Sequence, residues 1–319
     1  MAGGARRRGT QAGGRASARP SPLARPERVV ALGLCVLDEI FLVDDFAVRE
    51  GRTRYRAHLR MSGGMSATAI AQAAALGSSA ELISLLGDDR EGRFLIRSLR
   101  AEGVVTRRVV RSPTLPTTVS LVLIHRTSGE RRFVLPDRRA LERAAPDFDL
   151  APVRPGALLM VDGHYARQAL RALRRARERG VPTIADFADA RPAYRRMLPW
   201  IDYPIVPLEF VERYGAGGPR ETLRALIALG ARSAVVTLGA NGALALHEGR
   251  FFSVPARKVK VLDTTGAGDV FHGAFAAGLV EGRSVSGALA LASRAAAGNC
   301  RALGGMGALL RKRARPPGS

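Results

Sequence analysis

The stretch DTTGAGDVFHG, Asp263–Gly273, combines two closely spaced glycines, a helix start and a carboxylate. The valine-containing run Lys258–Leu262 before it is typical of a strand end, and the residues after it are small helix formers. The stretch therefore predicts a strand–loop–helix junction. Gly266 and Gly268 have no Cβ atom, and the first amides of a helix have no partner within it, so the loop is suited to hold an anion.

Asp269 stands beside this predicted anion cradle. A carboxylate repels phosphate, but it can accept the proton of a hydroxyl that attacks phosphorus. We therefore interpret the stretch as a phosphoryl-transfer site. In this interpretation Asp269 is the general base, and the amides of Gly266, Ala267 and Gly268 stabilise charge on the transferred group.

Two other interpretations of the glycine loop were considered. Asp269 could simply cap a helix after a glycine turn. A dinucleotide-binding loop is also rich in glycine, but it normally opens the first βαβ unit, whereas this loop lies late in the chain. The sequence contains no G-x-x-x-x-G-K-[ST] loop, which excludes the common P-loop route to phosphoryl transfer.

The DTTGAGD heptad resembles the second signature of the ribokinase/PfkB family of carbohydrate and nucleoside kinases. The segment Ser62–Gly77 resembles the first signature, with Thr68 where the family commonly has Asn. A branch that contains the sulfofructose kinases shares the Ala-Thr-Ala run there and resembles this chain at DTTGAGDVFHGA and at Cys300–Gly305. The resemblance implies an α/β, ribokinase-like fold: a mostly parallel sheet covered by helices on both faces, with a small β lid. It also implies ATP-dependent phosphorylation of a small sugar or sugar derivative, with Mg²⁺.

The same resemblance assigns residues to the site. Those implied to bind substrate are Asp38, Gly63, Gly64, Thr68 and Asp269, and those implied to bind nucleotide are Thr237, Gly239, Gly242, Thr265, Gly266, Gly268 and Asn299. Glu209 is implied to organise Mg²⁺, although Val206 replaces the asparagine of its N-x-x-E motif, and Asp263 with Thr265 is implied to hold a monovalent cation such as K⁺. Asp38 as a solvated turn residue, Glu209 as a helix-surface acid and a plain hairpin turn at residues 237–242 are the alternatives.

The remaining pattern fits this fold. Thr117–Leu135 alternates apolar and polar residues around a turn, which predicts a β-hairpin, and with residues 39–60 it would form the lid (about 39–60 and 115–135). Such a lid would exclude water from the reacting phosphate. From Ala157 the chain alternates strands and helices, as in a parallel sheet. Ligands of open α/β sheets bind beyond the carboxyl ends of the strands, which places Asp162 and Asp186 near the cleft.

Composition sets the limits of this interpretation. With 319 residues, 46% of them hydrophobic, the chain can build one large α/β domain, predicted over residues 28–310. Two cysteines and no apolar run of membrane-spanning length lead us to expect a cytoplasmic protein without a membrane partner.

The net charge of +22 could indicate nucleic-acid binding. Ten of these charges lie in residues 1–28 and 311–319, which are rich in Gly, Pro or Ala. Residues 1–27 and 311–319 are therefore predicted to be disordered basic tails. The chain has 47 Arg against three Lys, and no aromatic-studded basic stripe, so a dedicated nucleic-acid partner is not expected.

Two other functions remain open from the sequence alone. A nucleoside kinase of the same fold would need an aromatic wall for the base, and only 5% of the residues are aromatic. A regulator that binds sugar or nucleotide without catalysis is favoured by the missing asparagines at 68 and 206, but not by the intact Asp269. Lid strands of this family often pair between subunits, which suggests a homodimer.

Overall fold

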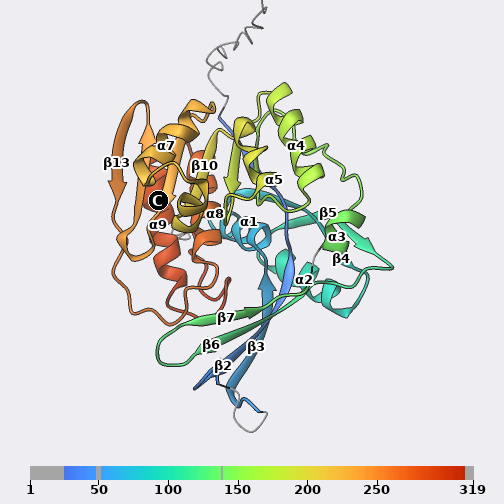
Figure 1. Ribbon diagram of the computed structural model, residues 1–319. Helices are drawn as coiled ribbons and strands as arrows, with labels where there is room; N and C mark the ends of the chain where they lie inside the picture. The colour runs from blue at the N-terminus through green and yellow to red at the C-terminus, as the bar shows by residue number, and fades with distance from the viewer. Residues whose placement is uncertain (1–24, 48–51, 138, 313–319) are drawn as a thin grey trace, which may run out of the picture.

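The computed structural model describes residues 25–47, 52–137 and 139–312, which form two β-sheets with flanking helices (Figure 1). The main sheet has nine strands. In spatial order these are β13 (Arg250–Val254), β12 (Ala243–His247), β11 (Ser233–Thr237), β10 (Tyr203–Pro207), β9 (Thr183–Asp186), β8 (Ala157–Val161), β1 (Arg28–Leu32), β4 (Ser79–Gly87) and β5 (Val105–Ser112). All neighbours from β11 to β5 are parallel, and β12 and β13 are antiparallel. The predicted mostly parallel sheet is confirmed.

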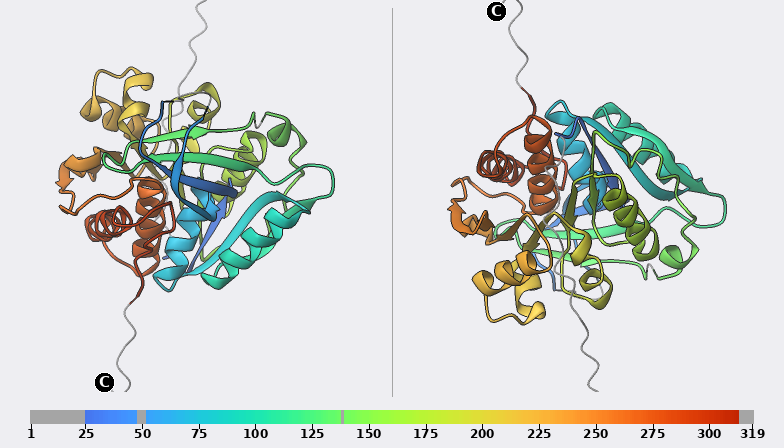
Figure 2. Two further views of the ribbon diagram at one scale, coloured as in Figure 1. Left: turned by 90° about the horizontal axis from the view of Figure 1, so that it is seen from below. Right: turned by 90° about the horizontal axis from the view of Figure 1, so that it is seen from above.

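Helices cover both faces of this sheet (Figure 2). Those on one face are α1 (Met65–Ala75), α2 (Arg90–Ala101), α8 (Ala267–Val280) and α9 (Val285–Asn299). Those on the other are α3 (Arg139–Ala144), α4 (Ala166–Glu178), α5 (Pro192–Arg195), α6 (Leu208–Tyr214) and α7 (Pro219–Ala228). The central strand β1 shows why. Val29 and Ala31 join the first hydrophobic core, and Val30 and Leu32 join the second, because successive side chains point to opposite faces.

A separate four-stranded sheet projects from the main body (Figure 1). Its order is β3 (Tyr55–Gly63), β2 (Val36–Val43), β6 (Val119–His125) and β7 (Arg131–Val134). The β6–β7 pair is the predicted hairpin. Both β2 and β3 reach closer to the main body than predicted, so Asp38 and Gly63 belong to the small sheet itself. A small core of Ile40, Val122 and Ile124 packs against Leu303 and fixes one face of this sheet to the body.

Helices α1 and α2 begin and end at residues suited to helix caps. Gly64 is the N-cap residue of α1, and Gly77, with a φ of +88°, follows its C-cap. Asp89 caps α2 by accepting a hydrogen bond from the Gly92 amide at 2.7 Å.

One predicted strand is wrong. The run Lys258–Leu262 is not a strand, because β13 already ends at Val254. Val261 and Leu262 are 51% and 41% exposed, and the Leu262 amide donates to the Cys300 carbonyl at 2.8 Å. The valine-rich composition indicated a strand, but the segment instead runs beside the end of α9.

The folded part of the chain extends beyond the predicted limits of 28–310. The Arg25 guanidinium donates to the Val280 carbonyl, and the Lys312 amide donates to the Ala75 carbonyl at 3.0 Å. The predicted tails otherwise lie outside the described residues. No helix in the described ranges has both the length and the apolar character needed to cross a membrane.

The close contact of α1 and α8 depends on Gly273. A Cβ atom at this position would lie 2.0 Å from the Ala69 carbonyl oxygen of α1. That distance is well inside van der Waals contact, so α8 can reach its place beside α1 only with glycine here.

We expect Gly273→Ala to lower the free energy of unfolding by about 1–3 kcal/mol, the usual cost of overpacking a core. The matched control is Gly298→Ala in α9, where nothing lies within 4 Å of the added methyl group. Alanine is the better helix former, so this control should raise stability by up to about 1 kcal/mol. Urea unfolding of both variants measures the difference, and equal stabilities would contradict the packing described here.

Candidate active site

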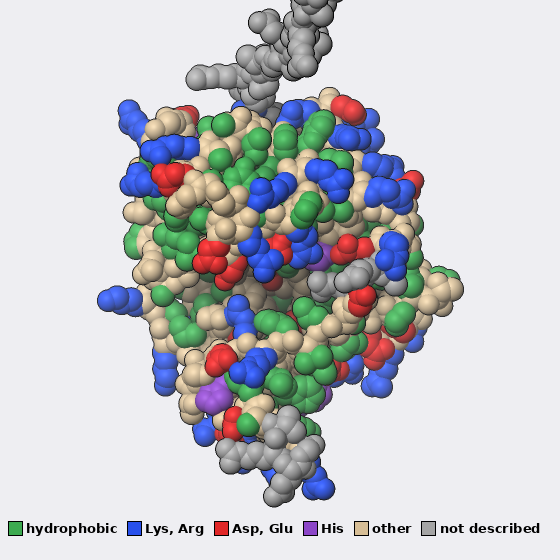
Figure 3. All heavy atoms as spheres, viewed as in Figure 1, with side chains coloured by type: hydrophobic (Ala, Val, Ile, Leu, Met, Phe, Trp, Pro, Cys, Tyr) green, Lys and Arg blue, Asp and Glu red, His purple; other side chains and the backbone are tan. Residues whose placement is uncertain are grey.

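Three aspartates meet at the carboxyl-terminal edge of the main sheet. Asp162 follows the last residue of β8, Asp186 ends β9, and Asp269 lies in the first turn of α8. Figure 3 shows a hollow between the main body and the small sheet, with acidic and basic side chains along its rim. The sheet rule placed Asp162 and Asp186 here correctly, and the structure brings both to the loop that begins at Asp263.

The loop Asp263–Gly268 is held from inside by a buried carboxylate. One Asp263 oxygen accepts hydrogen bonds from the amide and hydroxyl of Thr265 at 2.8 and 2.7 Å, and the other accepts from the Gly304 amide at 2.7 Å. Gly266 has a φ of +69°, and a Cβ atom there would lie 2.4 Å from the Gly305 Cα. The loop can therefore lie against residues 304–305 only because Gly266 is glycine.

The loop leads directly into α8, whose N-cap residue is Gly266. The first amides of a helix have no carbonyl partner within it and carry the positive end of the helix dipole. Gly268, in this first turn, is exposed. The Ala267 amide already donates to the Thr264 carbonyl at 3.3 Å, so the anion cradle rests on the amides of Gly266 and Gly268 and stays a prediction.

The carboxyl groups of Asp269 and Asp186 lie close enough to act on each other electrostatically. Two carboxylates this near to each other repel when both are ionised. Burial raises the pKa of Asp186 to about 8, and the charge of Asp162 adds to the rise. Burial likewise raises the pKa of Asp269 to about 7, with the neighbouring Asp186 as the second cause. Near neutral pH the pair therefore holds one proton, and the other carboxyl group is free to act as a base.

Asp162 is fixed by three donors. Its oxygens accept from the Leu34 amide at 2.7 Å, the Ser66 hydroxyl at 2.9 Å and the His164 amide at 3.0 Å. This places its negative charge firmly behind Asp186.

His272 was missed by the sequence analysis. It lies one turn after Asp269 on α8 and is only 3% exposed. Nδ1 is 2.8 Å from the Gly268 carbonyl and 3.4 Å from an Asp186 oxygen, and Nε2 is 3.1 Å from the Ile205 carbonyl. Burial lowers the pKa of His272, and the carbonyl contacts and the charge of Asp269 oppose this effect. The imidazole links the start of α8 to β10 and supports the carboxyl pair. In the sequence, only its position three residues after Asp269, on the same face of a helix, could have indicated that His272 lies near the site.

Asp38 faces the same site from the small sheet. It is 6% exposed, and its hydrogen-bond partner is Ser120 on β6. Burial raises the pKa of Asp38 to about 7, and the charge of Asp269 contributes next. A Cβ atom on Gly63 would lie 1.9 Å from an Asp38 oxygen, so the carboxyl group needs glycine beside it.

Two buried hydroxyl groups lie on the elements next to Asp38. Within the described ranges, Oγ of Ser62 and Oγ1 of Thr68 have no hydrogen-bond partner. A buried unpaired hydroxyl is unfavourable by about 1–3 kcal/mol, so such groups normally have a ligand or water partner. Gly64, at the N-cap of α1, lies between them in sequence. These positions fit the predicted substrate end of the site.

The predicted nucleotide residues fall into two groups. Thr237 ends β11, and Gly239 and Gly242 flank the turn that leads to β12, with φ values of +56° and +88°. Asn299 is different, because it is fully buried. Its amide nitrogen donates to the Thr265 carbonyl at 3.1 Å, and its oxygen accepts from the Ala308 amide at 3.3 Å. Because both ends of its amide group are bonded to the backbone, Asn299 is not placed to contact a nucleotide directly. Its side chain instead connects the loop Asp263–Gly268 to residue 308.

The predicted metal positions were compared with the donors present. No group of three or more His, Cys, Asp or Glu side chains suited to a metal ion occurs in the described part of the chain. Glu209 is exposed in the first turn of α6, where a single carboxylate fits Mg²⁺ that keeps most of its waters. Both oxygens of Asp263 already accept hydrogen bonds, so a monovalent cation at Asp263 and Thr265 stays a prediction.

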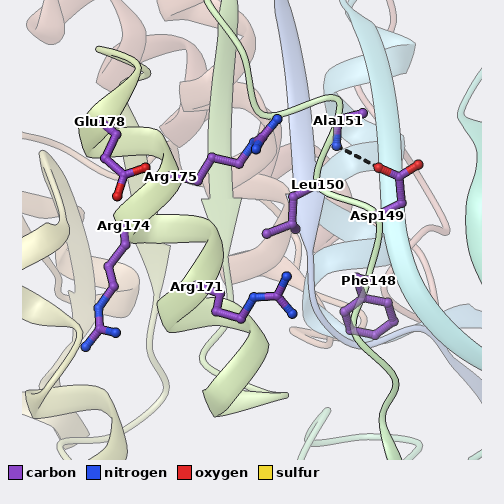
Figure 4. Close-up of a pocket in the computed structure, with 8 residues that line it drawn as sticks. All are labelled: Phe148, Asp149, Leu150, Ala151, Arg171, Arg174, Arg175 and Glu178. Atoms are coloured by element: carbon purple, nitrogen blue, oxygen red, sulfur yellow. Dashed lines mark hydrogen bonds between the residues drawn. The ribbon is translucent and has the colours of Figure 1, made fainter.

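A cavity of about 520 Å³ lies elsewhere, between the second half of α4 and residues 148–151 (Figure 4). It is far from the aspartates, because α4 runs back from Asp162 toward the opposite edge of the sheet. Two of its arginines have partners outside the cavity. Arg171 pairs with Asp147 at 2.6 Å, and Arg175 donates to the Val153 carbonyl at 3.1 Å. We therefore place the chemistry at the aspartate cleft and not in this cavity.

An open parallel sheet, a glycine loop at a helix N-terminus and a small sheet over the cleft define a phosphotransferase architecture. Residues 26–311 match the pfkB family of carbohydrate kinases, and the chain belongs to this family. Sugar kinases of this family are ATP-dependent phosphotransferases, and this protein is an enzyme of that class.

The ribokinase of Lactococcus lactis subsp. lactis is 28% identical over 72% of this chain and 76% of its own length. The 2-dehydro-3-deoxygluconokinase of Thermoproteus tenax is 30% identical over 79% of this chain and 83% of its own length. A crystal structure of a candidate ribokinase from Agrobacterium tumefaciens superposes with a TM-score of 0.82 at 27% identity and covers 90% of this chain and 95% of its own. The ribokinase-like fold predicted from the sequence is thus confirmed.

The shared proton leads to a prediction about stability. In the folded protein Asp186 keeps its proton up to about pH 8, whereas its ordinary pKa is 3.8. Between these values the folded state binds more protons than the unfolded state, so the contribution of Asp186 to stability falls as the pH rises. Asp186→Asn removes this dependence. Its melting temperature relative to wild type should therefore be higher at about pH 9 than at about pH 5.

Asp189→Asn is the matched control for this prediction. Hydrogen bonds from Arg191 hold the pKa of Asp189 below its ordinary value, so this group does not titrate between those two pH values. The difference in melting temperature between Asp189→Asn and wild type should therefore be the same at about pH 5 and at about pH 9. A pH-independent difference for Asp186→Asn would show that Asp186 holds no proton in the folded protein.

Proposed function

We propose that this protein transfers the terminal phosphoryl group of ATP to a hydroxyl group of a small sugar or sugar derivative, with Asp269 as the general base. The position of Asp269 carries the proposal. It directly follows the predicted anion cradle and interacts electrostatically with Asp186 at the end of β9 and with Asp38 on β2 of the small sheet. A carboxyl group with a pKa of about 7 is well matched to accept a proton near neutral pH.

The substrate end supports a polyol. This end of the site contains the carboxyl group of Asp38 and the hydroxyl groups of Ser62 and Thr68. The two hydroxyl groups have no hydrogen-bond partner within the described ranges. Carboxylates and hydroxyls are suited to binding several hydroxyl groups at once. Similar curated proteins include ribokinases, a 2-dehydro-3-deoxygluconokinase and the ketohexokinase of Mus musculus, which are named for sugar or sugar-acid substrates.

ATP and Mg²⁺ are the expected cofactors. Thr237, Gly239 and Gly242 would border the nucleotide, and the amides of the predicted anion cradle would face its phosphates. When bound, Mg²⁺ would neutralise phosphate charge, and Glu209 is the residue we propose to organise it. A solved structure of a candidate ribokinase II from E. coli, with a TM-score of 0.77 and 21% identity, contains ATP and Mg²⁺.

A nucleoside kinase is the second candidate function. We propose Phe133 on β7 as the aromatic side chain that such an enzyme would need, because it is 45% exposed and lies opposite Val122, a residue of the small core that faces the body. A base could stack against this ring. The aminoimidazole riboside kinase of Salmonella typhimurium is 26% identical over 74% of this chain.

We also propose a homodimer through the small sheet. β3 and β7 are its edge strands, and an unpaired edge can extend into another sheet. Leu121 and Val134, which are paired opposite each other, are 40% and 57% exposed. Light scattering over a range of concentrations measures the oligomeric state directly.

The proposed chemistry is tested by ADP release from Mg-ATP with ketoses, aldoses, sulfosugars and nucleosides. We expect turnover with a sugar, and a loss of about 100- to 10,000-fold in kcat for Asp269→Asn, the usual contribution of a general base. Calorimetry of ATP binding to this variant controls for an intact site. Intact ATP binding without turnover on any acceptor would instead favour a non-catalytic sugar or nucleotide binder.

The pH dependence of kcat/KM provides a second test of the base. Asp269 must be ionised to accept a proton, and its pKa lies near 7, not near the ordinary 3.8. Activity should therefore fall as the pH drops through about 7. An acid limb near pH 4 would show that the burial of Asp269 does not raise its pKa during turnover.

A further inference from the structure

The cleft is strongly acidic for a site that must receive ATP. The pKa shifts of Asp38, Asp186 and Asp269 show that their carboxyl groups act on one another and on nearby Asp162 and Asp263. Each of these carboxyl groups repels an approaching phosphate group whenever it is ionised, and the repulsion is strong where water is scarce. Burial lowers the pKa of His272, which lies behind Asp269, whereas the guanidinium of Arg131 brings a permanent positive charge to bear on Asp269.

Arg131 lies on the face of the small sheet that looks toward the main body. The register of β6 and β7 pairs Arg131 with Ile124 and Phe133 with Val122. Paired residues share a face, and Ile124 and Val122 belong to the small core that packs against Leu303. On β2, Ile40 of the same core lies two residues after Asp38, and residues two apart on a strand point to the same face. Arg131 and Asp38 therefore point to the same side of the small sheet.

The guanidinium of Arg131 reaches the glycine loop. Its Nη1 donates a hydrogen bond to the hydroxyl of Thr264, which stands between Asp263 and the anion cradle. Burial raises the pKa of both Asp269 and Cys300, and the charge of Arg131 partly opposes this rise, so the guanidinium lies within electrostatic reach of Asp269. A guanidinium has five N–H donors in a planar fork, and the bond to Thr264 leaves donors for phosphate oxygens.

We propose that Arg131 is a further catalytic residue: the small sheet brings its guanidinium to the phosphoryl group that is being transferred. This inference rests on the proposed function. In the reaction the substrate oxygen bonds to the terminal phosphorus as the bond from that phosphorus to the bridging oxygen of ATP breaks. The hydroxyl proton passes to Asp269, and ADP leaves with the bridging electrons. Arg131 exchanges no proton and stabilises the negative charge on the transferred group.

The matched control is the next residue of the strand. Arg132 pairs with Leu123, so it lies on the opposite face of the small sheet, where its guanidinium stands 4.4 Å from the centre of the Phe46 ring. Replacing either arginine with alanine removes the same charge and the same side-chain atoms from one short strand. Only Arg131→Ala removes a donor from the cleft.

We expect Arg131→Ala to lower kcat by about 100- to 1,000-fold, as loss of one transition-state donor does, with KM for the sugar changed less than about threefold. Arg132→Ala should keep kcat within about threefold of wild type. Arg131→Lys retains a positive charge without the planar fork, and its kcat should be about tenfold higher than that of Arg131→Ala. The acid limb of the pH profile of Arg131→Ala should also move to higher pH, because a positive charge near Asp269 is gone.

Wild-type turnover on the acceptor panel tests the proposed function, and the two alanine variants test Arg131. If wild type turns over a sugar and Arg131→Ala matches Arg132→Ala in kcat and in the acid limb, the role of Arg131 is overturned while the kinase function stands. If wild type turns over no acceptor, the proposed function fails. Calorimetry with Mg-ATP then decides: binding weakened at least fivefold in Arg131→Ala alone supports contact with phosphate, and equal affinities overturn it.

Discussion

The buried carboxylate of Asp263 is the constraint on which the site depends. It accepts hydrogen bonds from residues on two loops that are about forty positions apart in sequence, Thr265 and Gly304. A buried carboxylate without such donors would be unfavourable by several kcal/mol, so the two loops must lie together for the chain to fold. Their contact in turn requires glycine at 266, and Gly266 sets the first residue of α8. The position of Asp269 is therefore a consequence of how Asp263 is satisfied.

The acidity of the cleft has a structural cost and a chemical use. Asp186 is buried and Asp269 is half-buried beside it, although two such groups repel when both are charged. The three donors around Asp162 keep its negative charge in place behind them. This fixed charge and the low polarity of the surroundings push the proton onto the pair and raise its pKa into the neutral range. Apolar side chains in these positions would pack with less strain, but they could not accept a proton.

The sequence predicted the main features of the fold because they depend on local signals. The heptad DTTGAGD predicted the glycine loop that leads into α8 and so the position of Asp269, and the rule for open sheets predicted the positions of Asp162 and Asp186. The strand prediction at Lys258–Leu262 failed because β-propensity says nothing about whether a partner strand is available. Arg131 and His272 were missed for a related reason. Adjacent arginines on a strand look alike until the register with β6 separates Arg131 from Arg132. The contacts of His272 with Ile205 and Asp186 join segments that are distant in sequence.

The departures from the family pattern at Thr68 and Val206 have different structural settings. Val206 is fully buried in the second hydrophobic core and so contributes to packing there. Thr68, by contrast, keeps a buried hydroxyl group that finds no partner within the described ranges, and so does Ser62. A protein that bound no polar ligand would gain about 1–3 kcal/mol at each such position by replacing the hydroxyl with an apolar group of the same shape. Hydroxyl groups left unpaired on elements beside Asp38 are therefore expected where a ligand with its own hydroxyl groups completes the hydrogen bonds. Because Thr offers one hydroxyl where Asn offers an amide donor and an acceptor, that ligand must present a different pattern of hydroxyl groups from one bound through Asn.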